Sequence, residues 1–443
     1  MISLGLGAAL NAAGHKVQSY KKGPDYIDPM WHHAATGNPC FNLDFFTQSH
    51  AEIERTFDSN RASADLVYVE GNKGLFDGVD TLGSDSNAAL AHQLGLPVVL
   101  IVNARGITRG IAPLLSGYEH FSNEIRYAGI ILNEVAGPRH EAKLLAAVKE
   151  YTGLRVLGVV PKLSKLHLEE RHIGLVPQNE ACYAEAYIRK TRDLVREHVD
   201  IEALLEHSVN LDLPAAAGSE QSGGESKLKI GIARDRAFGF YYPDDLQSMQ
   251  QQGAELVFFD TLQDRELPRV DALFIGGGFP ETQLQALHEN TAMRTRIRDF
   301  IHAGKPVYAE CGGLMYLCRD ISYLGKREQM VGAIDASVIM TDKPIGRGYA
   351  KIQARASHLW GGGVNTSEQR ACHEFHYSTL QGSAANSEMA YQVLRGYGVN
   401  GASDGIMVGN TLATYCHQRH TENNPWVTQF INFIQKTQNH ESN

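Results

Sequence analysis

The chain has 443 residues, 43% of them hydrophobic and 21% charged, which is typical of a globular protein with two or three domains. A formal net charge of −9, with no segment rich in Lys and Arg, argues against a nucleic-acid partner. The longest apolar run, "PVVLIV", is too short to cross a bilayer, and no signal peptide is recognisable. The six cysteines lack CxxC spacing. We therefore expect a cytoplasmic protein with free thiols and no membrane partner.

The first half of the chain alternates between strand and helix patterns. The residues "MISLGLGAALNAAG" predict a buried helix that ends at Gly14, and "HKVQSY" predicts the next strand. Continuous apolar runs, typical of parallel strands covered on both faces, follow in "ADLVYVEG", "LPVVLIVNA", "YAGIILNEV" and "RVLGVVP". Helical patterns such as "HEAKLLAAVKEYTG" lie between them. Residues 1–205 therefore predict an α/β wound sheet.

A change of composition divides the chain. Residues 206–227 are rich in Ala, Gly, Ser and acidic residues, and predict an interdomain linker. A second α/β series begins with "LKIGIARD" and continues through "GAELVFFD", "VDALFIGGG" and "KPVYAECGG". We therefore expect a second wound-sheet domain over residues 228–443.

Charged residues follow the strands of the first half. Lys21 ends the second predicted element, at the edge where open α/β sheets bind ligands, and Asp25 and Asp28 follow in a proline-containing loop. Asp44 lies in "FNLDFF", and Glu70 ends the strand before the loop "GNKGLFDG". A carboxylate such as Glu70 is either a satisfied strand end or a metal ligand, and its place beside a Gly-rich loop favours Mg²⁺.

The stretch "GKPVYAECGGLMYLC" places Cys311 on a tight turn between a strand and a helix. The free N–H groups at the start of that helix stabilise a thiolate, so a nucleophilic role is favoured over that of a packed core cysteine. Gly312 removes a side chain where backbone must pass close by, and we expect it to belong to the oxyanion site.

A cysteine nucleophile also needs an oxyanion site and a base. The turn "IGGGFPE" offers the backbone N–H groups of Gly277 and Gly278, and "LATYCHQRH" offers His417. Each signal alone is weak, because a Gly-rich turn is usually only a turn. Their order, strand–GGG, strand–Cys–GG and strand–His, resembles the class I glutamine amidotransferase domain, in which the cysteine attacks the glutamine amide and the histidine transfers the proton.

One residue departs from that pattern. Class I domains usually carry Glu two residues after the histidine, and this chain has Arg419. This departure, with the stretches "GRGYAKI" and "CHEFHYS", resembles the amidotransferase domains fused to cobyrinic-type synthetases. A metal site at His373 and His376 is disfavoured, because no third ligand is signalled nearby, and we expect a structural or substrate-contacting role.

The motifs "KKGPDYIDPMWHHAATG" and "VEGNKGLFDG" resemble the amidoligase domain of the cobyrinate a,c-diamide synthase family. That domain is P-loop-NTPase-like and related to dethiobiotin synthetase. The resemblance implies that ATP phosphorylates the a and c acetate groups of a cyclic tetrapyrrole and that ammonia from glutamine displaces phosphate. It also implies Mg²⁺, with Asp44 and Glu70 as its ligands, and Lys21 as a phosphate contact.

The same resemblance assigns further residues. Asp25, Asp28 and Asp77 are expected to shape the carboxylate and nucleotide site. Asn133, which ends "GIILN", is expected either to face the purine or to form a plain turn. Small-molecule partners are implied, namely the tetrapyrrole, glutamine and ATP, and a homodimer is compatible with the family.

Family members begin with a strand and a GxxxxGKT phosphate loop, and by eye Met1 aligns just after that loop. We therefore expect that a start codon has been assigned too far downstream, and that the printed chain is unstable or inactive in synthesis.

Two alternatives stay open. The family's usual "EGVMGLFDG" is replaced by "EGNKGLFDG", so sirohaem or a sirohydrochlorin is a second candidate substrate. A glutaminase-only or regulatory protein with a vestigial synthetase half is a candidate from another class. Nucleotide binding by a chain extended upstream separates it from the enzymes.

Overall fold

The computed structural model describes residues 1–162, 170–171, 174–181, 183–211, 228–361, 364–384 and 388–441. The chain divides into two compact units, one of Met1–Phe45 with His50–Ala217 and one of Phe46–Ser49 with Gly218–Asn443. Residues 212–227 of the predicted linker, and Cys182, lie outside the described residues. The other five cysteines are free thiols.

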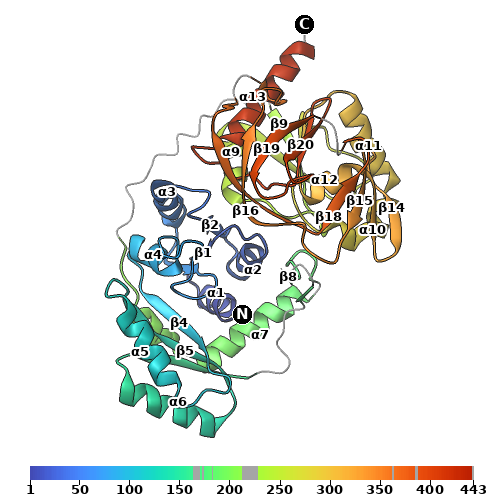
Figure 1. Cartoon of the computed structure of the whole chain (residues 1–443). Coiled ribbons are helices and arrows are strands. Elements are labelled where there is room, and N and C mark those ends of the chain that lie inside the picture. Colours follow the sequence, from blue (N-terminus) through green and yellow to red (C-terminus); the bar gives the residue numbers. More distant parts are fainter. Residues whose placement is uncertain are drawn as a thin grey trace. The chain divides into compact units, whose positions relative to one another are not determined.

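The first unit follows the predicted alternation of strands and helices (Figure 1). Its elements are α1 (Ile2–Ala12), β1 (Val17–Lys22), α2 (Ile27–Thr36), β2 (Phe41–Leu43), α3 (His50–Arg61), β3 (Leu66–Glu70), α4 (Asn87–Gln93), β4 (Val98–Asn103), α5 (Ile111–Phe121), β5 (Tyr127–Val135), α6 (Pro138–Tyr151), β6 (Val156–Pro161), β7 (Glu170–Arg171), β8 (Gly174–Leu175), α7 (Ala184–His198) and α8 (Ile201–Glu206).

Short polar side chains and a glycine set several helix ends. The Ser86 side chain accepts the Ala89 N–H at the start of α4, and Asp200 accepts the Ala203 N–H at the start of α8. Gly37 ends α2 in the left-handed conformation, with φ 76°, which glycine adopts at little cost.

Side chains of β5 alternate between two apolar layers. Ile130 and Leu132 pack with α5 and α6, whereas Ile131 packs with α1 and α7 on the opposite face (Figure 1). The central strand of β4-β5-β6 is therefore covered on both faces, as predicted for a parallel wound sheet.

The prediction of fully covered strands is wrong for β3 and β4. The parallel strands of this unit form two separate sheets, β2-β1-β3 and β4-β5-β6, so β3 and β4 are edge strands. All five residues of β3 are only partly buried, and Ile101 in β4 is 45% exposed. An apolar run predicts a strand, but it does not report how many neighbours that strand has.

The second unit contains a nine-stranded sheet in the order β10-β9-β11-β12-β21-β20-β19-β16-β17 and a four-stranded sheet in the order β14-β13-β15-β18. Its elements are β9 (Leu228–Ala233), α9 (Pro243–Gln251), β10 (Ala254–Phe259), β11 (Ala272–Ile275), the 3-10 helix η1 (Pro280–Gln283), α10 (Leu284–Glu289), α11 (Thr291–His302), β12 (Val307–Glu310), α12 (Gly312–Leu317), β13 (Cys318–Tyr323), β14 (Lys326–Gln329), β15 (Ile334–Met340), β16 (Gly346–Ala354), β17 (Gln369–His376), β18 (Ser378–Gln381), β19 (Met389–Arg395), β20 (Ser403–Val408), β21 (Thr411–Thr414) and α13 (Trp426–Glu441).

The two faces of β12 belong to different apolar layers. Val307 and Ala309 pack with α11 and α12, whereas Tyr308 packs with Trp426 and Phe430 of α13. The strand is buried on both faces and ends directly at Cys311.

Only part of the large sheet is wound as predicted. Strands β10, β9, β11, β12 and β21 are parallel, but β20, β19, β16 and β17 continue the sheet in antiparallel order. Among the described residues, no helix combines the length and hydropathy needed to cross a membrane.

Candidate active site

Cys311 occupies the predicted turn between β12 and α12, in a strained conformation. Its φ of 48° and ψ of −101° lie outside the usual regions for a residue with a side chain. The turn is fixed on both sides, because the Cys311 N–H donates to the Thr414 carbonyl at 2.7 Å and its carbonyl accepts the Met315 N–H at 3.0 Å. Holding such a conformation costs about 1–3 kcal/mol, which is typical of a functional site.

His417 lies three residues beyond β21 and is held by β17. Its N–H donates to the His373 carbonyl at 2.8 Å, and the two imidazole rings stack with centroids 4.9 Å apart. Burial lowers the pKa of His417, but the negative charge of Cys311, with a smaller contribution from Glu310, outweighs burial and raises this pKa to about 10. The arrangement therefore favours a protonated His417 ring beside Cys311.

Of the three predicted oxyanion glycines, Gly277 lies against His417, and Gly312 follows Cys311 and lies against Gly278. A Cβ atom at Gly277 would lie 2.5 Å from His417 Cε1, and one at Gly312 would lie 2.8 Å from the Gly278 carbonyl oxygen. The first N–H groups of α12 have no partner within the helix. The structure thus brings together Cys311, His417 and the glycine turn, while the oxyanion role stays a prediction.

We expect Gly277→Ala to lower kcat for glutamine hydrolysis by about 100-fold, because the added methyl displaces His417 and small misplacements cost that much. Gly117→Ala in α5 is the control, since a Cβ there meets nothing within 4 Å. Steady-state glutaminase kinetics on both variants, after circular dichroism confirms folding, measure the effect. Wild-type kcat in a folded Gly277→Ala variant would contradict the need for this close approach.

The residues of the "CHEFHYS" stretch have structural partners. Glu374 accepts the N–H groups of Tyr397 and Gly398 at 2.5 and 2.8 Å. His376 stacks on Tyr415, with ring centroids 3.9 Å apart. Within the part of the chain that the structure describes, no group of three or more His, Cys, Asp or Glu side chains is arranged to hold a metal.

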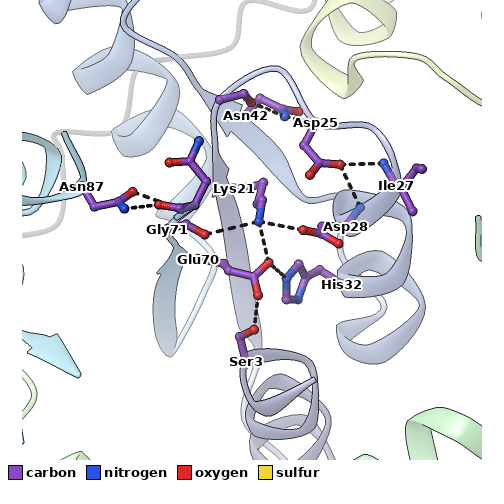
Figure 2. A network of polar contacts seen from close by, with 12 residues as sticks. Ser3, Lys21, Asp25, Ile27, Asp28, His32, Asn42, Glu70, Gly71 and Asn87 are labelled. Carbon is purple, nitrogen blue, oxygen red and sulfur yellow. Dashed lines mark hydrogen bonds and ion pairs between the residues drawn. The ribbon is translucent and has the colours of Figure 1, made fainter. Parts of the chain in front are cut away.

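In the first unit, Lys21 lies at the centre of a buried polar network (Figure 2). The β1–β3 register sets Lys21 opposite Glu70, with Nζ 3.1 Å from Glu70 Oε2, and Nζ also lies 2.7 Å from Asp28 Oδ2. Burial alone lowers the pKa of Lys21, but the charges of Glu70 and Asp28 outweigh it and raise this pKa. The ammonium group is therefore charged and fixed.

Glu70 has two further partners, His32 and Ser3 (Figure 2). His32 Nε2 lies 2.8 Å from Glu70 Oε2, and the Ser3 hydroxyl donates to Oε1. Burial raises the pKa of Glu70, but its hydrogen bond and charge interaction with His32, then the charge of Lys21, lower this pKa well below its usual range.

Asp25 shapes the loop before α2. Its carboxylate accepts the N–H groups of Ile27 and Asp28, and its carbonyl accepts a hydrogen bond from Asn42 (Figure 2). Burial, then the nearby charge of Asp28, raises the pKa of Asp25 to about 6.

The remaining predicted residues of this unit are Asp44, Asp77 and Asn133. Asp44 is buried directly after β2, which pairs with β1. Asp77 is exposed in the loop after β3, where it accepts the Gly74 N–H. Asn133 lies in β5, and its carbonyl accepts the Ala104 N–H. None of these three residues is labelled in Figure 2.

Several members of the network, among them His32, Ser3 and Asn87, were not predicted from the sequence. His32 follows Asp28 by four residues, so both lie on one face of α2, and that spacing was an available signal. Ser3 reaches Glu70 across 67 residues, which no local pattern reports. Asn87 fastens the loop after β3 by donating to the Gly74 carbonyl at 2.8 Å.

Comparison with known proteins assigns both halves of the chain. Residues 229–425 match the family model of the CobB/CobQ-like glutamine amidotransferase domain, and residues 45–170 match that of an AAA domain. The chain is 42% identical to the cobyrinate a,c-diamide synthase of Magnetococcus marinus, over 97% of this chain and 93% of that one, and 38% identical to that of Archaeoglobus fulgidus, with the same coverage. A crystal structure of a glutamine amidotransferase from Thermotoga maritima aligns with 48% of this chain and 85% of its own, at 11% identity and a TM-score of 0.31. At this identity and coverage, the chain belongs to the cobyrinate a,c-diamide synthase family.

Proposed function

We propose that this chain uses ATP and glutamine to amidate the a and c acetate carboxylates of cobyrinic acid. The observation that carries the proposal is the likeness to cobyrinate a,c-diamide synthases over 97% of the chain, which includes both polar sites described above. The strained Cys311 beside His417 supports glutamine hydrolysis. The fixed Lys21 beside carboxylates supports phosphoryl chemistry.

In the second unit, the Cys311 thiolate attacks the glutamine amide carbon and forms a tetrahedral intermediate. The backbone N–H groups of Gly277, Gly278 and Gly312 are the proposed donors to its oxyanion. His417 donates a proton to the departing nitrogen, so that the C–N bond breaks and ammonia leaves a thioester behind. Water, deprotonated by the now neutral His417, hydrolyses the thioester to glutamate and restores the thiolate.

In the first unit, the γ-phosphoryl group of ATP passes to an acetate oxygen, and ammonia then attacks the acyl carbon and expels phosphate. Lys21 supplies a fixed positive charge for the phosphate groups, and Asp28 holds that ammonium group in place. Asp25 keeps the loop before α2 in shape.

Asp44 and Glu70 are the proposed ligands of Mg²⁺, which neutralises phosphate charge when bound. Their carboxylate oxygens have the chemistry that this ion prefers, and one or two carboxylates suffice when phosphates supply the other ligands. Glu70 is already ionised, because its pKa is held low, and it is fixed by Ser3 and His32. Glu70 therefore has the charge and the fixed position that a ligand of this ion needs, and Asp44 stays a prediction. A homodimer and a cytoplasmic location stay predictions.

Mass spectrometry of the products tests the proposal. The printed chain, and a form extended to the next upstream start codon, each receive Mg-ATP, glutamine and either cobyrinic acid or sirohydrochlorin. We expect two successive mass decreases of about 1 Da on cobyrinic acid, each being a hydroxyl replaced by an amino group. A diamide formed only from sirohydrochlorin would replace the substrate, and glutamine hydrolysis without any amide product in either form would favour a glutaminase-only protein.

A further inference from the structure

A histidine that transfers protons needs a third group to fix its ring and balance its charge. Around His417, the charged or titratable groups come from several elements: Cys311 at the start of α12, Glu310 at the end of β12, His373 in β17, and Arg419 two residues on. Arg419 is a cation, and its guanidinium pairs with Asp244 of α9 at 2.6 Å and lies over the Tyr242 ring. It therefore cannot accept a proton from His417.

Glu310 lies beside His417, where it can fix the imidazole ring and balance its charge. Its Oε2 is 3.6 Å from His417 Nδ1, an ion-pair distance longer than a hydrogen bond, and the two side chains are 2% and 3% exposed. Its other oxygen, Oε1, accepts the Tyr308 hydroxyl at 2.6 Å and the Gln418 N–H at 2.9 Å. These two bonds fix the carboxylate, and the Gln418 bond ties it to the residue that follows His417.

His373, whose ring stacks on that of His417, is not the charged member of this pair. Burial, and then the charges of His417 and Arg419, lower the pKa of His373 well below its usual value, so its ring is neutral. The Tyr242 hydroxyl lies 3.2 Å from His373 Nδ1. Of the two stacked rings, only that of His417 is therefore protonated, and it is the ring that interacts with Cys311 and Glu310.

We propose that Glu310, the residue directly before the nucleophile, is the positioning residue that orients His417 and holds its ring protonated for Cys311. The inference rests on the proposed glutaminase activity of this unit. The end of β12 then positions both reacting groups. It leads directly into the turn that holds Cys311, and its last residue, Glu310, orients His417.

Glu310→Gln tests the role, with Glu310→Asp as the conservative variant and Asp404→Asn as the matched control. Asp404 is also a buried carboxylate, and it holds the same segment by accepting the N–H groups of Tyr415 and Cys416 at 2.9 and 2.8 Å. We expect Glu310→Gln to lower kcat for glutamine hydrolysis by about 100-fold with little change in KM. The pH profile of Cys311 alkylation by iodoacetamide is expected to move up by about one pH unit. Glu310→Asp is expected to recover part of both effects.

The control separates positioning from folding. Asp404→Asn is expected to lower the melting temperature without moving the alkylation profile. If Glu310→Gln does not fold, Tyr308→Phe removes one bond to Glu310 Oε1 and is expected to shift the profile in the same direction. An unmoved alkylation profile in folded Glu310→Gln overturns the inference. Wild-type protein that hydrolyses no glutamine counts against the proposed function instead, because the alkylation profile is measured without turnover.

Discussion

We expect Cys311→Ala to abolish glutamine-dependent amidation, with a loss of about 1,000-fold or more, and to leave amidation with free ammonium salts close to wild type. The alanine removes the sulfur that attacks the amide, while ammonia added from solution bypasses that step. The difference between the two nitrogen sources is measured by product formation with glutamine or with ammonium chloride. Loss of both activities in a folded variant would count against the assignment of Cys311 to glutamine hydrolysis alone.

Cys311→Gly is the matched variant that isolates the strain of the turn. Both variants lack the sulfur, but glycine adopts the φ of 48° more readily than alanine does. Relief of about 1–3 kcal/mol of strain exceeds the 0.5–1 kcal/mol, roughly, by which glycine disfavours folding. We therefore expect Cys311→Gly to melt above Cys311→Ala in calorimetry. A lower melting temperature would show that the turn is not strained in solution.

The nucleophile's turn could be predicted because its signal is local. The strand "PVYA", then Cys311, then two glycines specify a tight turn with no reference to distant residues, and the structure has that turn. The approach of Glu310 to His417 could not be predicted in the same way. It depends on the parallel pairing of β12 with β21, strands that are far apart in the chain.

The limits of the strand predictions have a similar cause. The composition of "LVYVE" and "VVLIVN" predicts two strands, but whether a strand is central or at an edge depends on which other segments pair with it. In the same way, the alternation of strands and helices predicted the wound half of the second unit. The antiparallel strands β16, β17, β19 and β20 were not predicted, and their order in the sheet depends on which distant segments pair with them.

We expect Glu70→Gln to lower ATP-dependent amidation by about 100-fold or more and to leave glutamine hydrolysis unchanged. The amide is a poorer ligand for Mg²⁺, and Lys21 and His32 lose the negative charge that they share. Asp28→Asn is the comparison, because it removes the other carboxylate bound to Lys21 without removing a proposed metal ligand. Product formation is measured against Mg²⁺ concentration. The Mg²⁺ concentration that gives half-maximal activity is expected to rise in Glu70→Gln and to stay unchanged in Asp28→Asn. Unchanged synthesis in Glu70→Gln would refute the metal role.

The same variant changes how stability depends on pH. Because the folded-state pKa of Glu70 is lowered, its charge stabilises the fold above the ordinary glutamate pKa, and this contribution is lost as the pH falls below it. Losing one charged acceptor costs about 1.5–3 kcal/mol at neutral pH. Urea denaturation is therefore expected to separate wild type from Glu70→Gln at pH 7, and the difference is expected to be smaller at about pH 3, because the contribution falls gradually between the ordinary glutamate pKa and the lowered folded-state pKa. A constant difference at both pH values would mean that Glu70 supports the fold by packing, and that the ion pairs with Lys21 and His32 contribute little.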